Sequence, residues 1–185
     1  WAALILPWVW LGRFGPLWML WIVLVDAAIV TYFNARPWGL VGVAFGMPEM
    51  QWIGLLFNCA ALILWERAAW LPRWGARALG FLTGGMATAL GVQAFHRSQG
   101  IDRGILAVYL LWAVTTYVYY RDRRIDIFML SGLVLSGIVM FVATFGYLAV
   151  DYMEVFGLFV CAAGIIGFSA LGARWIRALA KEPRP

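Results

Sequence analysis

The sequence predicts an all-α fold, an integral membrane helical bundle of about six transmembrane helices with both termini in the cytoplasm. Of its 185 residues, 64% are hydrophobic and only 12% are charged, whereas soluble domains carry roughly 25% charged residues. Apolar runs close to the length of a membrane span recur along the chain, and basic residues gather in alternate connections. A water-soluble fold is therefore excluded, and we expect residues 1–185 to form a single transmembrane domain.

Six apolar segments approach the roughly 20 residues that a transmembrane helix needs. The first opens with Gly15-Pro16, where proline suits a first helical turn, and the second follows the break at Pro48-Glu49. The expected spans cover approximately residues 15–33, 50–66, 76–95, 105–120, 125–148 and 152–175.

The basic residues orient these spans, because lysine and arginine near span ends mark the cytoplasmic side. With the N-terminus inside, the inner segments hold Arg13, Arg67, Arg73, Arg77, Arg121, Arg123, Arg124, Arg174, Arg177, Lys181 and Arg184. The outer segments hold Arg36, Arg97 and Arg103. This alternation agrees with six spans and two cytoplasmic termini.

Two shorter apolar stretches fall outside the six spans. Residues 1–11 are too few to cross a bilayer, so they are either an interfacial segment or the stump of a seventh helix, which would move the N-terminus outside. Residues 38–47 are expected to extend the first hairpin at the membrane surface. The chain begins with Trp1 rather than methionine, which leaves open whether it is a fragment or the ordered part of a longer protein, and no cleavable signal peptide is visible.

Aromatic and small residues have regular positions in these spans. Many tryptophans fall near span ends, where amphipathic rings favour the headgroup layer; these are Trp8, Trp10, Trp18, Trp38, Trp52, Trp65, Trp70, Trp74 and Trp175. Small residues recur every four positions, as at Gly80, Gly84 and Thr88, or at Gly132 and Ser136, which lets membrane helices approach closely. We therefore expect a compact bundle.

Asp26 is the one carboxylate near the middle of an expected span. Because a charge at this depth is costly, Asp26 should face the bundle interior or be protonated. Asn58 lies at a similar depth in the next, antiparallel span and is the first candidate partner, with Gln93 and Thr115 as others. Two interpretations stay open: a proton or cation relay, or a structural hydrogen bond between two helices.

No motif for catalysis, a metal, a cofactor or nucleic acid stands out. His96 is the only histidine, which excludes a bis-histidine haem within the chain and disfavours a zinc site. Cys59 and Cys161 lie in apolar runs without CxxC spacing and are expected to be packing residues. The basic turn at residues 121–124 is expected to be a topological anchor, with anionic lipid contact as an additional role.

Three stretches resemble a large bacterial family of multi-pass membrane proteins known only as a domain of unknown function. They are the span from Leu17-Trp18 to Tyr32-Phe33, the basic turn Tyr120-Arg121-Asp122-Arg123-Arg124, and the closing Gly172-Ala173-Arg174-Trp175. The resemblance implies an uncharacterised protein of the bacterial inner membrane and transfers no catalytic residue.

These observations favour a non-enzymatic membrane protein, either a structural or accessory subunit or a member of that family. Its expected partners are the lipid bilayer and other membrane subunits. The alternative is a small-solute or proton transporter or channel that uses Asp26. A third possibility, an interfacial enzyme, would depend on Glu66, Arg67 and Arg73 at the inner face.

Overall fold

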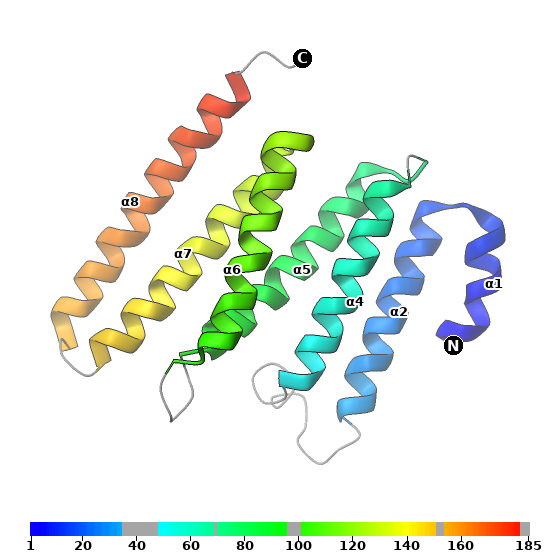
Figure 1. Cartoon of the computed structure of the whole chain (residues 1–185), viewed down its shortest axis with the longest axis horizontal. Coiled ribbons are helices and arrows are strands. Elements are labelled where there is room, and N and C mark those ends of the chain that lie inside the picture. The colour runs from blue at the N-terminus through cyan, green and yellow to red at the C-terminus, as the bar shows by residue number, and fades with distance from the viewer. Residues whose placement is uncertain (35–47, 69, 96–100, 151–153, 182–185) are drawn as a thin grey trace. The chain divides into compact units, whose positions relative to one another are not determined.

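The computed structural model describes residues 1–34, 48–68, 70–95, 101–150 and 154–181, and these are helical apart from short caps and turns (Figure 1). The elements are α1 (Ala2–Gly12), α2 (Gly15–Asn34), α4 (Pro48–Arg67), α5 (Arg73–Gln93), α6 (Arg103–Val118), the π-helical turn η1 (Tyr119–Arg123), α7 (Ile127–Val150) and α8 (Glu154–Lys181). No strand occurs in the described ranges. The all-α prediction is confirmed, and each of the six apolar segments corresponds to one helix.

Local chemistry explains several of these boundaries. The Asp102 carboxylate accepts hydrogen bonds from the backbone N–H groups of Gly104 (3.0 Å) and Ile105 (3.2 Å), which caps the first turn of α6. Asp126 accepts in the same way from the Phe128 N–H (3.0 Å) at the start of α7. Arg13 ends α1 in the left-handed region, with φ of 42°.

By length and apolar composition, three helices in the described residues could cross a membrane, rather than the six expected. They are Gly15–Phe33, Ile127–Tyr147 and Phe159–Lys181. The α-helical part of α6 has only 16 residues, because the chain continues as the π-helical turn η1. The segment α4 contains polar Gln51 and Asn58 and ends in Glu66-Arg67, and α5 carries Arg73 and Arg77 in its first turns. Polar groups in α4 and α5 and the short length of α6 thus distinguish these helices from the three apolar ones.

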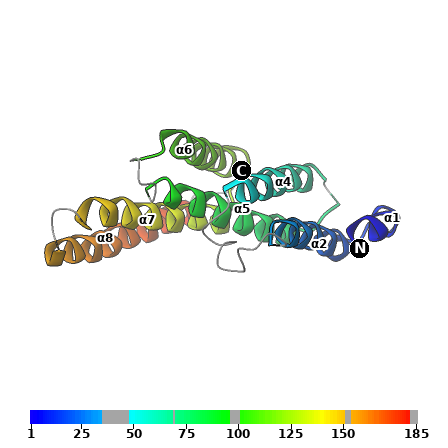
Figure 2. The ribbon, with the colours of Figure 1, turned by 90° about the horizontal axis from the view of Figure 1, so that it is seen from below.

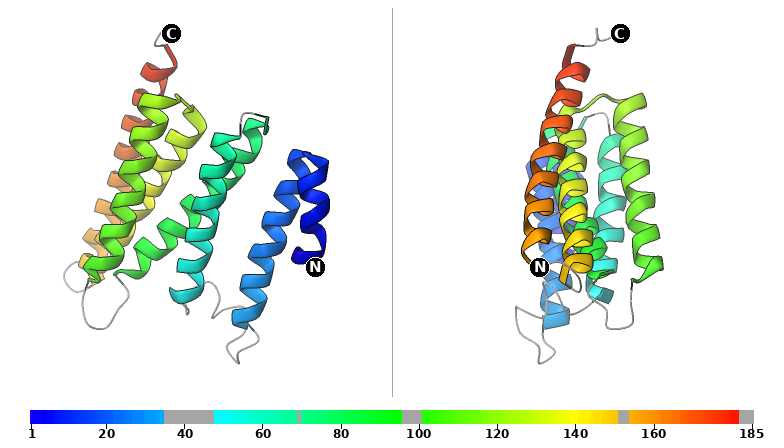
Figure 3. Two further views of the ribbon diagram at one scale, coloured as in Figure 1. Left: turned by 45° about the vertical axis from the view of Figure 1, so that its right-hand side comes forward. Right: turned by 90° about the vertical axis from the view of Figure 1, so that its left-hand side faces the viewer.

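Residues 2–12, left open by the sequence, form the short helix α1. It folds back beside α2, as the left panel of Figure 3 shows, and the Trp21 indole N–H of α2 donates to the Ala2 carbonyl (3.0 Å). Its 11 residues rise only about 16 Å, far less than the roughly 30 Å hydrocarbon core. Residues 38–47, expected at the membrane surface, lie outside the described residues.

The chain forms two compact units, residues 1–86 and 87–185, whose boundary falls within α5. The core of the first unit contains Ile22, Trp65, Ala76 and Leu79. Trp65 is only 4% exposed, and its indole N–H donates to the Pro72 carbonyl (2.9 Å) across the α4–α5 turn. Its expected place in a membrane-interface belt is therefore wrong, because its N–H is satisfied inside the protein.

The second unit is built on the hairpin of α7 and α8, which lie side by side in Figure 2. Phe141 of α7 packs against Phe168 of α8, with ring centroids 4.8 Å apart, and its ring covers Gly164. Other large apolar side chains of α8 are open to the surroundings, as Phe159 and Ile166 are each 70% exposed. Such a surface suits contact with lipid or with another apolar partner.

Candidate functional site

Asp26 and Asn58 meet inside the first unit. Asn58 is completely buried, and its side-chain Nδ2 donates to Asp26 Oδ1 over 2.9 Å. Asp26 lies in the middle of α2 and is half-buried. The antiparallel course of α2 and α4, visible in Figure 1, brings the midpoints of the two helices together. The other partners considered, Gln93 and Thr115, belong to the second unit.

The Asn58 amide is held from more than one side. Its Nδ2 also donates to the Gly54 carbonyl one turn earlier (3.0 Å) and lies 3.9 Å from the Met86 sulfur. The close approach of Met86 depends on the small residue at 54, since a Cβ added there would lie 3.3 Å from both Sδ and Cε of Met86. Three helices, α2, α4 and α5, therefore surround one amide.

The carbonyl oxygen of this amide is unusual. Asn58 Oδ1 is buried and has no hydrogen-bond partner within the described part of the chain. Both fixed acceptors, Asp26 Oδ1 and the Gly54 carbonyl, face Nδ2, so rotating the amide by 180° would set oxygen against oxygen. The arrangement offers a carboxyl group that can exchange a proton, beside a free acceptor. In the described segments, no group of three or more metal-ligating side chains comes together.

A second polar cluster, which the sequence analysis did not identify, lies in the second unit. Ser136 of α7 lies 2.7 Å from Thr88 Oγ1 of α5 and 2.9 Å from the Tyr109 hydroxyl of α6. Ser136 and Tyr109 are both buried. The sequence predicts Thr88 and Ser136 only as small packing residues. The available signal was that buried hydroxyl groups in apolar helices require partners, but the sequence did not indicate which helices adjoin.

A glycine makes this cluster compact. A Cβ added to Gly91, one turn after Thr88 on α5, would lie 2.7 Å from the Met140 sulfur and 3.2 Å from Tyr109 Cδ2. Backbone and side chains can therefore approach only because residue 91 has no side chain.

The structure describes only some of the remaining sequence candidates. Glu66 and Arg67 end α4 and Arg73 begins α5, so all three lie at one end of the first unit. Cys59 and Cys161 are free cysteines. His96 and Arg97 lie outside the described residues.

Comparison with known proteins adds no assignment. No family model matches the chain, and neither the curated proteins nor the solved structures provide a match.

Proposed function

We propose that this chain is a non-enzymatic multi-pass protein of the bacterial inner membrane, a structural or accessory subunit of a membrane complex. It would cross the membrane six times with both termini in the cytoplasm, and would belong to the bacterial family of unknown function that it resembles. One observation carries the proposal. Two buried polar side chains, Asn58 and Ser136, form hydrogen bonds to polar side chains of neighbouring helices, Asn58 to Asp26 and Ser136 to Tyr109. These groups serve assembly, while the exposed helix faces are apolar.

Purification of the full chain in mild detergent, from cells that express it naturally, tests the subunit role. We expect one or more other membrane proteins to co-purify in fixed stoichiometry. Recovery of the chain alone from two mild detergents and from polymer-extracted native membranes would contradict the subunit proposal.

Cysteine labelling at the two ends of the segment formed by α6 and η1 tests the six-span topology. Ile101 precedes α6 and Arg123 ends η1, and both are exposed. In a background with Cys59 and Cys161 replaced by serine, we expect Ile101→Cys to react with a membrane-impermeant maleimide from outside, and Arg123→Cys only after permeabilisation. Labelling of both from the same side would refute the topology.

A small-solute or proton transporter is the second candidate, because Asp26 adjoins a buried oxygen that lacks a hydrogen-bond partner in the described residues. An ionisable group within a membrane helix is a functional hypothesis by default. Asp26→Asn distinguishes the two functions, since an amide oxygen can still accept from Asn58 while the titratable proton is lost. The assay is proton flux into proteoliposomes, driven by a potassium potential and followed with an entrapped pH dye.

The transporter function requires flux by the wild-type protein and its loss in Asp26→Asn. Equal flux in wild-type and variant vesicles, at or near the level of empty vesicles, would exclude proton transport through Asp26. A normal elution profile of the variant shows that it remains folded.

A further inference from the structure

Six basic side chains gather at one end of the second unit. Three belong to η1 and its C-cap, and three to the last turns of α8; they are Arg121, Arg123, Arg124, Arg174, Arg177 and Lys181. The Trp175 ring of α8 stacks on the Tyr117 ring of α6, with centroids 6.1 Å apart and planes 26° from parallel. This stacked pair joins the ends of α6 and α8, and so places the two basic groups on the same end.

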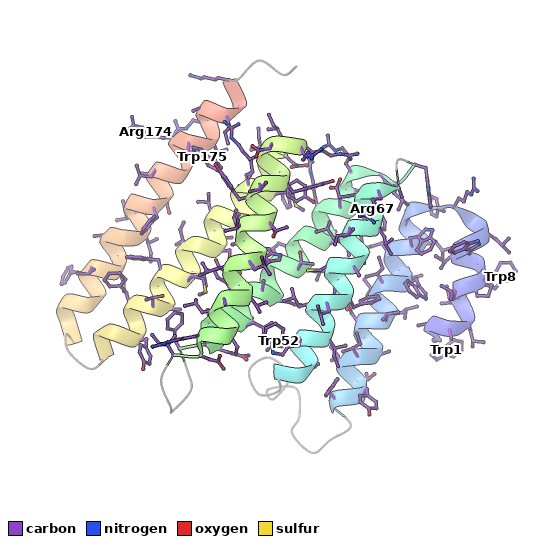
Figure 4. The ribbon with its side chains drawn as sticks, in the orientation of Figure 1. Trp1, Trp8, Trp52, Arg67, Arg174 and Trp175 are labelled. Atoms are coloured by element: carbon purple, nitrogen blue, oxygen red, sulfur yellow. The ribbon has the colours of Figure 1, made fainter. Side chains whose placement is uncertain are left out.

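The basic residues of α8 form one stripe on a fixed helix. Positions 174, 177 and 181 follow the i, i+3, i+7 spacing of a single helical face, and all three side chains are exposed. Figure 4 shows Arg174 directed outward and Trp175 on the other side of the helix. Leu179 in the same turns is buried, so this end of α8 is packed against the protein.

Negative charge among the described residues at this end is sparse. Among residues 119–126 and 172–181 only Asp122 and Asp126 are acidic, and Asp126 is buried at the start of α7. The six cations therefore retain a clear excess of positive charge.

We propose that this basic end of the second unit binds the headgroups of anionic phospholipids. Charge complementarity favours a phosphate-bearing partner, and position favours a lipid over a nucleic acid or an acidic protein. The cations directly adjoin an aromatic pair, which suits the headgroup layer. They also adjoin exposed apolar side chains such as Phe168 and Leu171, which suit acyl chains. The inference rests on the proposed membrane location and adds lipid selectivity to it.

The test measures binding of single lipids to the purified full chain by native mass spectrometry in a neutral detergent. We expect dioleoyl-phosphatidylglycerol to bind at least about a hundredfold more tightly than dioleoyl-phosphatidylcholine. Each basic residue near a membrane surface contributes roughly a fivefold change in affinity, so Arg123→Gln/Arg174→Gln/Lys181→Gln should weaken phosphatidylglycerol binding by about a hundredfold.

A triple variant of the first unit, Arg13→Gln/Arg67→Gln/Arg73→Gln, is the matched control, because it removes the same charge elsewhere. It should bind phosphatidylglycerol within a few-fold of the wild-type protein. Equal loss in both triple variants, no preference for the anionic lipid, or equally tight binding of a single-stranded oligonucleotide would each overturn the proposal.

Three further measurements keep the outcomes separate. Unchanged melting temperatures show that both triple variants are folded. If charge is responsible, the variant Arg123→Lys/Arg174→Lys should retain most of the wild-type phosphatidylglycerol binding. Carbonate extraction of membranes tests membrane integration independently. If the wild-type chain resists extraction but shows no lipid preference, only the lipid site fails; if carbonate releases it, the membrane proposal itself fails.

Discussion

Replacing Asn58 with leucine should lower the free energy of unfolding by about 1–3 kcal/mol. The change removes two hydrogen bonds, of 2.9 Å to Asp26 and 3.0 Å to the Gly54 carbonyl. Of these two bonds only the one to Asp26 joins two helices, and such bonds in membrane proteins are worth about 0.6 kcal/mol on average and up to about 1.7 kcal/mol. Loss of the donor also leaves the half-buried Asp26 facing an apolar side chain, whereas removal of Oδ1, which has no partner in the described part of the chain, offsets part of the cost.

A double-mutant cycle isolates this interaction. Asp26→Leu/Asn58→Leu should be within about 1 kcal/mol of the wild-type protein, because replacing both partners by apolar groups is far less costly than removing one. Asp26→Asn, which keeps an acceptor oxygen, is the conservative control. The assay is reversible unfolding in mixed micelles as the fraction of sodium dodecyl sulfate is raised, followed by tryptophan fluorescence. If the two single effects add to within about 0.5 kcal/mol, the contact stabilises nothing and the reasoning is refuted.

Three further changes test the packing of the two units. Gly91→Ala should cost about 1–3 kcal/mol, because its Cβ would lie 2.7 Å from the Met140 sulfur, whereas Gly85→Ala, with no atom within 4 Å, should be neutral or slightly stabilising in the same melting assay. Ser136→Ala should cost about 1–2 kcal/mol, because it breaks two hydroxyl contacts at once; a melting temperature equal to wild type would show that the cluster is not structural. Trp65→Phe should cost about 1 kcal/mol through loss of the indole hydrogen bond that closes the α4–α5 turn, and a shift in the turn's proteolytic sensitivity should accompany it.

The positions of the helices were largely predictable, because long apolar runs bounded by Gly, Pro or basic residues leave few alternatives. The start of α6 was placed at residue 105, two positions late, although Asp102 is a typical N-cap and could have indicated the correct start. The π-helical turn η1 was not predictable, since Tyr119–Arg123 also has the composition of a basic loop.

Contacts between helices were predictable only for helices that follow one another directly in the chain. Asp26 and Asn58 lie on consecutive antiparallel helices at equal depth, so their meeting follows from the connection. The contact of Ser136 with Thr88 joins α5 and α7, which are not consecutive, and depends on lateral order that hydropathy does not encode. Trp65 lies near the end of an apolar run and so has the position of an interface tryptophan. Its burial depends on packing of the ring against Gly75, a contact that the sequence pattern does not reveal.

The buried oxygen of Asn58, which has no hydrogen-bond partner among the described residues, makes this residue a vibrational reporter. A carbonyl without a hydrogen bond absorbs at higher frequency than one that accepts from water, so isotope labelling of this one amide would reveal any solvent that reaches the middle of the first unit. A band that stays at high frequency when hydration is varied would show that water does not reach the contact between Asn58 and Asp26. A band that shifts on hydration would indicate a water path to Asp26 that opens and closes without any large rearrangement of the helices.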